Sequence, residues 1–170
     1  MAATLPAPTT AEIRSLLMRG NRLLGASLVE ANLVTVDNLE NANEKLLDLI
    51  AAGTQRQCTL LGVLAYDLKV LKEEDVLQYC VDEHNIGIIE LRNYEGAEEA
   101  RVGLSHAACW ATWTLPFDRE EDFTLIATAY YLSPAVRTYW EKQAGGPVIW
   151  YVTTLEDIAE ALERLATMKS

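Results

Sequence analysis

The sequence predicts an α+β fold, in which an N-terminal helical subdomain built from two helix-hairpin repeats is followed by a small mixed sheet covered by helices. Three observations predict it: an internal repeat in the first half, a change of composition near residue 100, and a strand, strand, helix, strand, helix order in the second half. The repeat reads Leu24-Gly25-x-x-Leu28-Val29-Glu30-x-x-Leu33-Val34 and recurs 37 residues later as Leu61-Gly62-x-x-Ala65-Tyr66-Asp67-x-x-Val70-Leu71. One supersecondary unit used twice produces such self-similarity, because a lone helix pair cannot bury its own apolar face. The alternative is two unrelated amphipathic helix pairs that share Leu at helical spacing.

The chain is expected to divide into a disordered tail (1–9), a helical repeat subdomain (10–95) and a small α/β subdomain (100–170). The tail is rich in small residues and Pro. Of the 13 aromatic residues, ten follow Cys109, whereas the first half packs mainly with Leu, Ile and Val. This shift of composition places the boundary between the two subdomains.

In the first half, Thr9 and Glu12 form a capping box that begins a helix running to about residue 18. Gly20 is expected to end this helix, since Gly is common just past a helix C-terminus. A second helix is then expected over residues 22–31. The first repeat therefore begins in a helical hairpin.

Asn32 should close that second helix in the left-handed conformation, which Asn tolerates better than most residues. Lys69 occupies the same place in the second copy and is a poorer choice, so the turn there is expected to close differently. Thr35 is a good N-cap for the helix that follows. In the second copy, helices are expected over 60–68 and after Lys72, where three carboxylates suit a helix N-terminus.

The second half predicts a small sheet with helices. A short β-branched segment over 86–91 should be a strand or an extended exit segment. Pro134 is placed for the first turn of a helix, and Thr153 with Glu156 forms a second capping box before the final helix. Three further segments have the apolar or alternating pattern of strands, the first two as a hairpin: residues 113–117, 123–129 and 148–152.

Composition excludes several classes of function. The net charge of −11 opposes nonspecific binding to nucleic acid, which requires clustered Lys and Arg. No apolar run is long enough to span a membrane, and no charged leader precedes an apolar stretch, so we expect a cytoplasmic protein without membrane insertion. Cys58, Cys80 and Cys109 cannot all pair and are expected to be free thiols. The sequence leaves the oligomeric state open.

Two groups of residues invite a catalytic or metal-binding interpretation. His106 and Cys109 lie three apart, but two ligands are too few for a zinc site. Asp118 to Asp122 contains four carboxylates, which are expected to form a solvated hairpin tip rather than a cation site. We therefore predict no catalytic residues, no metal and no enzyme activity. The many aromatic residues of the second half either fill its core or lie partly exposed for an interface.

These features resemble the N-terminal module of the type II secretion and type IV pilus assembly ATPases, the GspE-N or MshEN family. The family signature Arg-Leu-Gly-x-x-Leu-Val is repeated in a helical subdomain, which a small α/β subdomain follows. In the second half, Leu115-Pro116-Phe117, the strand from Phe123, Ser133-Pro134, Val148-Ile149 and Leu155 to Leu162 occur in the family's order. No Gly-x-x-x-x-Gly-Lys-Ser/Thr motif is present, so we expect a stand-alone domain without the ATPase engine of its full-length relatives.

The resemblance also implies a candidate ligand, because some family members bind cyclic di-GMP through the Arg and the adjacent Leu-Gly of each copy. The implied ligand-binding residues are Arg22, Leu23, Leu24, Gly25, Leu28, Leu60, Leu61 and Gly62. The family's Arg positions are Leu23 and Leu60, and Arg22 lies one place earlier. Two interpretations follow: a scaffold that kept the packing residues and lost the ligand, or a cyclic di-GMP receptor.

We expect a non-catalytic interaction or regulatory module without a bound cofactor. Its partner is expected to be a protein of a secretion or pilus apparatus, or of a separate signalling pathway. Cyclic di-GMP remains the alternative ligand.

Overall fold

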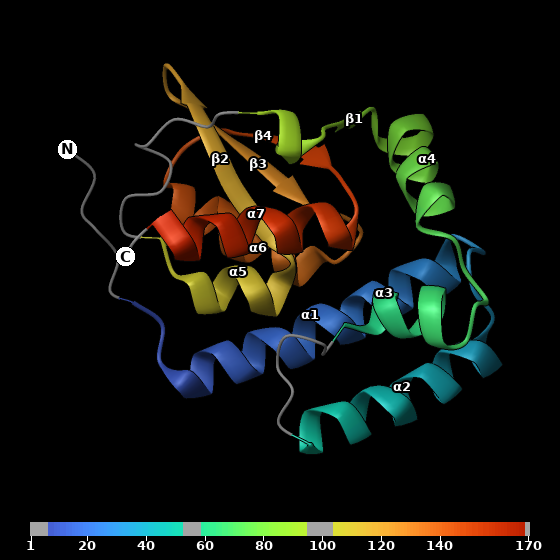
Figure 1. The fold of residues 1–170 in the computed structure, drawn as a ribbon. Helices are drawn as coiled ribbons and strands as arrows, with labels where there is room; N and C mark the ends of the chain where they lie inside the picture. Colours follow the sequence, from blue (N-terminus) through green and yellow to red (C-terminus); the bar gives the residue numbers. More distant parts are fainter. Residues whose placement is uncertain (1–6, 53–58, 95–103, 169–170) are drawn as a thin grey trace.

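The computed structural model describes residues 7–52, 59–94 and 104–168 and has the predicted α+β fold (Figure 1). The helices are α1 (Thr10–Glu30), α2 (Val36–Ala51), α3 (Leu60–Gly62), α4 (Glu73–His84), α5 (His106–Thr112), α6 (Pro134–Ala144) and α7 (Leu155–Met168). A π-helix, η2 (Val63–Asp67), continues α3, and a 3-10 turn, η3 (Leu91–Asn93), follows the first strand. The strands β1 (Gly87–Ile88), β2 (Thr114–Glu120), β3 (Phe123–Thr128) and β4 (Val148–Val152) form one sheet in the order β1-β4-β3-β2.

The first helix is longer than the sequence indicated. The Thr9 cap is confirmed, since its hydroxyl accepts the backbone N–H of Glu12 at 3.1 Å. The predicted break at Gly20 is wrong, because α1 continues unbroken to Glu30. Gly20 is buried where α1 packs against α6, and its carbonyl accepts the Ser133 hydroxyl at 2.7 Å. A single Gly costs a helix only about 1 kcal/mol, which packing on both sides of this residue offsets.

The two copies of the repeat begin differently, because Leu24 and Gly25 lie inside α1 whereas Leu61 and Gly62 lie at the N-terminus of α3. Thr35 caps α2 as predicted, and Thr59 caps α3 in the same way through the backbone N–H of Gly62. Asn32 has the predicted left-handed conformation, with φ of 61°. Lys69 shares this left-handed conformation, with a φ of 54°. The turn there nevertheless closes differently, as expected, because the Val70 N–H donates to the Leu64 carbonyl, whereas the Leu33 N–H donates to the Leu28 carbonyl. The second copy also differs inside its helix, where the Leu68 N–H donates to the Val63 carbonyl in a π-turn.

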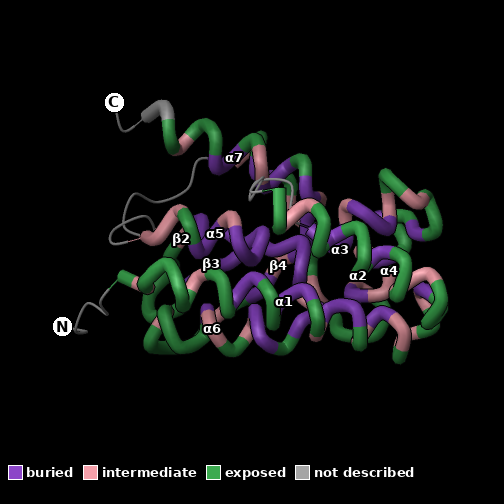
Figure 2. The backbone as a smooth tube through the Cα atoms, turned by 90° about the horizontal axis from the view of Figure 1, so that it is seen from below, coloured by how far each residue is buried: buried purple, intermediate pink, exposed green. Residues whose placement is uncertain are grey.

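The mixed sheet contains the predicted hairpin of β2 and β3, which are antiparallel, while β4 lies parallel to both β3 and β1. Glu121 turns the hairpin with a φ of 54°. Figure 2 shows α7 on one side of the strands and α6 on the other. Pro134 opens α6 as predicted, and Ser133 precedes it as the N-cap residue. The sheet is therefore the middle layer between two helices.

The cap of α7 lies one residue later than predicted. Thr154, rather than Thr153, accepts the N–H of Asp157 at 3.2 Å, so the proposed pairing of Thr153 with Glu156 is wrong. Thr153 instead donates its hydroxyl to the buried Asp157 carboxylate at 2.7 Å. That carboxylate also accepts the Leu91 N–H at 2.7 Å, and thereby joins η3 to α7.

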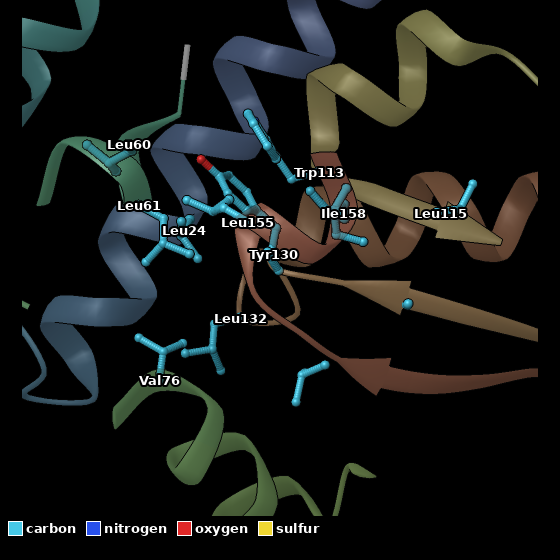
Figure 3. Packing of buried hydrophobic residues seen from close by; sticks show 14 of the residues in the cluster. Leu24, Leu60, Leu61, Val76, Trp113, Leu115, Tyr130, Leu132, Leu155 and Ile158 are labelled. Atoms are coloured by element: carbon cyan, nitrogen blue, oxygen red, sulfur yellow. The ribbon is translucent and has the colours of Figure 1, made fainter. Parts of the chain in front are cut away.

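The hydrophobic core is one continuous cluster that draws on both halves of the chain. Figure 3 shows Leu24 and Leu61 of the two repeats close to Tyr130 and Leu155. Strand β1 also comes from the first half, although it pairs with β4. The division at residues 95–100 stays a prediction, and residues 1–6 of the proposed tail lie outside the described residues. None of the helices described here is both long and apolar enough to cross a bilayer.

Candidate functional site

The residues of the two Leu-Gly motifs lie mostly inside the protein. Leu24, Gly25, Leu28, Leu60 and Leu61 are buried. Leu23 and Gly62 are part-buried, and Arg22 is exposed on α1. The structure thus brings the two motifs together as packing surfaces, and leaves Arg22 as the one polar side chain among the eight predicted residues.

Gly25 allows the two repeats to approach each other closely. A methyl group built on Gly25 would lie 2.7 Å from Leu39 Cδ1 and 3.0 Å from Leu60 Cδ2. The side of the glycine that a ligand would need is therefore filled by one leucine of α2 and one of α3. At Gly62, the same construction meets Thr59 Cγ2 at 2.7 Å.

The backbone N–H groups at the start of α3 already have partners within the chain. The Leu60 N–H donates to the Asn21 Oδ1 at 2.9 Å, and the Gly62 N–H donates to the Thr59 Oγ1 at 3.3 Å. The first N–H groups of a helix have no partner within the helix and often bind anions. Here side chains of the protein occupy the Leu60 and Gly62 N–H groups, so these two are not open to a phosphate.

Asn21, Thr59 and Tyr130 form a buried polar cluster that the sequence interpretation did not include. The Tyr130 hydroxyl donates to Asn21 Oδ1 at 2.6 Å and lies 2.6 Å from Thr59 Oγ1. The Asn21 amide nitrogen donates to the Leu17 carbonyl at 2.8 Å. This Asn21 cluster ties both repeats to the turn between β3 and α6. A signal was present, because Asn21 stands between Leu17 and Leu24 on the apolar face of α1.

His106 and Cys109, the two residues that invited a catalytic or metal-binding interpretation, both lie on α5. Cys109 is fully buried, and burial raises the pKa of its thiol. Burial likewise raises the pKa of the Cys80 thiol to about 12. Cys58 lies outside the described residues. In the ranges that the structure describes, no three His, Cys, Asp or Glu side chains are grouped to hold a metal ion.

The carboxylate run lies where the hairpin of β2 and β3 turns. Glu120, Glu121 and Asp122 are exposed, whereas Asp118 is part-buried and accepts the Tyr94 hydroxyl. That hydrogen bond raises the Tyr94 pKa to about 12. One member of the run is thus a structural acceptor, and the others form the solvated tip.

The aromatic side chains of the second half divide between core and partial exposure. Tyr130, Trp113, Trp140 and Trp150 are buried. The others in this half that the sequence singled out are part-buried: Trp110, Tyr131, Tyr139 and Tyr151. Most of them take part in edge-to-face contacts with ring centroids 5.1 to 6.0 Å apart, a favoured geometry.

Comparison with known proteins gives a likeness in structure alone. No family model and no curated protein matches the sequence. The solved structures that match include two that align over nearly their whole length. The structure of MshE with cdg, cyclic di-GMP, has a TM-score of 0.53 and 18% identity and covers 83% of this chain and 96% of that one. The N-terminal domain of XpsE has a TM-score of 0.54 and 16% identity and covers 94% of this chain and 99% of that one. The chain has a GspE-N/MshEN-like fold.

This GspE-N/MshEN-like domain departs from the family signature where the ligand was expected. Leu23 and Leu60 stand at the Arg positions, and Leu60 is completely buried. No guanidinium is therefore supplied from these two places. What the likeness establishes is the fold, an arrangement of helices with a small mixed sheet.

Proposed function

We propose that this chain is a non-catalytic interaction or regulatory module that docks onto a partner protein. The observation that carries the proposal is the close packing of the repeats, in which Leu39 and Leu60 occupy the space beside Gly25. The repeat then serves as a rigid scaffold, and recognition falls to the exterior. The fold shared with the N-terminal domains of MshE and XpsE supports a role of this kind.

The partner is a protein of a secretion or pilus apparatus, or of a separate signalling pathway. Photo-crosslinkable residues placed at the exposed positions Leu47, Tyr66 and Ile88 should give discrete adducts in the native host, which mass spectrometry identifies. Adducts with an apparatus component from at least one position support the proposal. Absence of any protein adduct from all three positions contradicts it.

Cyclic di-GMP binding is the second candidate function, favoured by the MshE structure that contains this dinucleotide. The geometry opposes it, because the helix N–H groups and the glycine faces are occupied. We expect isothermal titration of the protein with cyclic di-GMP to give no binding heat at micromolar concentration. Saturable heat that Arg22→Ala abolishes would support the receptor function instead.

A further inference from the structure

Arg137 on α6 is a cation without an ion-pair partner among the described residues. Its guanidinium carbon lies 4.9 Å from the centroid of the Tyr131 ring. Its Nε is buried and has no hydrogen-bond partner. The residue as a whole is part-buried, and Nε is the one guanidinium nitrogen that is both fully buried and without a hydrogen-bond partner. The net charge of the chain is −11, yet no carboxylate in the described ranges forms an ion pair with this cation.

Tyr131 belongs to a row of rings that runs from α4 to the sheet. Tyr79 and His84 of α4 have ring centroids 5.8 Å apart, and His84 lies 5.4 Å from Tyr131. Tyr131 in turn lies 6.0 Å from Trp150 of β4. We call these four rings with Arg137 the aromatic row. All four contacts, including that of the guanidinium, have ordinary stacking or edge-to-face distances.

An exposed apolar residue lies on the same side of the sheet. Ile88 of the edge strand β1 is paired with Val152, which projects to the same face as Trp150 because side chains alternate along a strand. Ile88 is 53% exposed. His84 ends α4 only four residues earlier in the chain. Ile88 therefore lies at the edge of the sheet, on the same face as Trp150 of the aromatic row.

The carboxylates near the row have other partners or face solvent. Glu141 accepts the Trp150 indole N–H at 3.1 Å, and Asp82 accepts the Gln78 amide at 2.9 Å. Glu83 is exposed on α4. None of the three lies within ion-pair distance of Arg137. A carboxylate from outside could form the two parallel hydrogen bonds that a guanidinium favours, without displacing an internal partner.

We propose that the aromatic row and Ile88 are the docking surface for an extended segment of a partner protein that carries an Asp or Glu beside an apolar side chain. The carboxylate binds the Arg137 guanidinium, and the apolar side chain packs against Ile88 and the exposed ring edges. Arg, Tyr and Trp are the residues most enriched among those that dominate interface energetics. This inference rests on the proposed function as an interaction module.

The test uses random short peptides displayed on phage. Peptides are selected on the wild-type chain and counter-selected on Arg137→Gln, and the enriched sequences are synthesised for fluorescence anisotropy. We expect an acidic residue next to an aromatic or aliphatic one, and binding about tenfold or more weaker with Arg137→Gln, as for a lost charged hydrogen bond. Arg14→Gln is the control. It changes an exposed arginine near the N-terminus of α1 and should leave the affinity unchanged. Arg137→Lys should restore only part of the affinity.

A peptide variant keeps the test decisive if Arg137→Gln fails to fold. Changing the peptide's acidic residue to its amide should then cost the same factor against the wild-type chain. Absence of any enriched peptide, or enriched peptides that bind Arg137→Gln equally well, overturns the docking surface. A dimer seen by light scattering that Arg137→Gln dissociates also overturns it, since a second copy would then be the occupant. The crosslinking experiment above decides the proposed function separately.

Discussion

Gly20 and Gly25 lie in the same helix but face different neighbours, which makes them a matched pair. Gly25→Ala forces a methyl group against Leu39 and Leu60, and overpacking of this kind should lower the free energy of unfolding by about 1–3 kcal/mol. Gly20→Ala meets Val136 Cγ2 at 3.4 Å, an ordinary contact, and should gain up to about 1 kcal/mol from helix propensity. Urea unfolding measures both. Equal effects of the two substitutions would contradict the packing described for the repeat.

Tyr130 is expected to stabilise the fold through its hydroxyl as well as its ring. Tyr130→Phe removes the group that joins Asn21 to Thr59 and leaves a buried Thr59 hydroxyl without its acceptor. The free energy of unfolding should fall by about 1–2 kcal/mol, measured by urea denaturation. Tyr139→Phe is the control, since this part-buried ring has no hydrogen bond in the described structure, and it should change stability by less than about 0.5 kcal/mol. A neutral Tyr130→Phe would show that the cluster contributes nothing net.

Asp157 joins α7 to η3, so its substitution should loosen the contact between these two elements. Its carboxylate is 2% exposed and accepts the N–H groups of Leu91 and Arg92 at 2.7 and 3.3 Å. Asp157→Asn replaces an acceptor by a donor and should cost about 1.5–3 kcal/mol, because hydrogen bonds to a charged group are stronger than neutral ones.

Hydrogen exchange should locate that loss. The amides of Leu91 and Arg92 should exchange faster in Asp157→Asn than in the wild-type chain, while those of β3 keep their protection. Glu160→Gln, an exposed change on the same helix, should leave both unchanged. Unaltered exchange at residues 91 and 92 would mean that η3 is held by other contacts.

The elements were predictable where local chemistry decides and not where distant packing does. The caps at Thr9 and Thr35, the left-handed Asn32 and the hairpin all follow from short-range patterns, and the structure has them. Gly20 could not be recognised as a helix interior, because the helix is kept by its contact with α6. The left-handed Lys69 is similarly imposed by its surroundings against its own preference.

The candidate site was harder to predict than the fold. The Leu-Gly motifs identify the repeat, but whether their glycine faces are open depends on Leu39, which the motif does not include. Arg137 gave no signal in the sequence, since its significance comes from the lack of an ion pair to any carboxylate of the described residues. Tertiary neighbours, rather than spacing along the chain, decide both questions.

The stability of the whole molecule should fall at alkaline pH, because three titratable groups have raised pKa values in the folded state. The pKa of Tyr66, Tyr94 and Cys80 is raised to about 12, from ordinary values of 10.0, 10.0 and 9.0. The hydrogen bond to Glu73 is the main cause for Tyr66, the one to Asp118 for Tyr94, and burial for Cys80. Because the unfolded chain releases these protons first, the stability they contribute is complete below about pH 9 and is lost between about pH 9 and 12.

Urea unfolding under reducing conditions, measured across this pH range, should show that decline. Tyr66→Phe should make the decline shallower, since it removes one of the three titrating groups. A free energy of unfolding that stays constant from about pH 9 to 11 would contradict the raised pKa values.

Helix α1 has a mechanical consequence for a docking module. It is about 31 Å long, packs against α5 and α6, and also contacts α2 and α3. Because one uninterrupted rod is shared by the repeats and by the sheet layer, it provides no hinge between them. If a partner binds the surface between α4 and α6, a force applied there should rotate the repeats and the sheet together rather than bend one against the other.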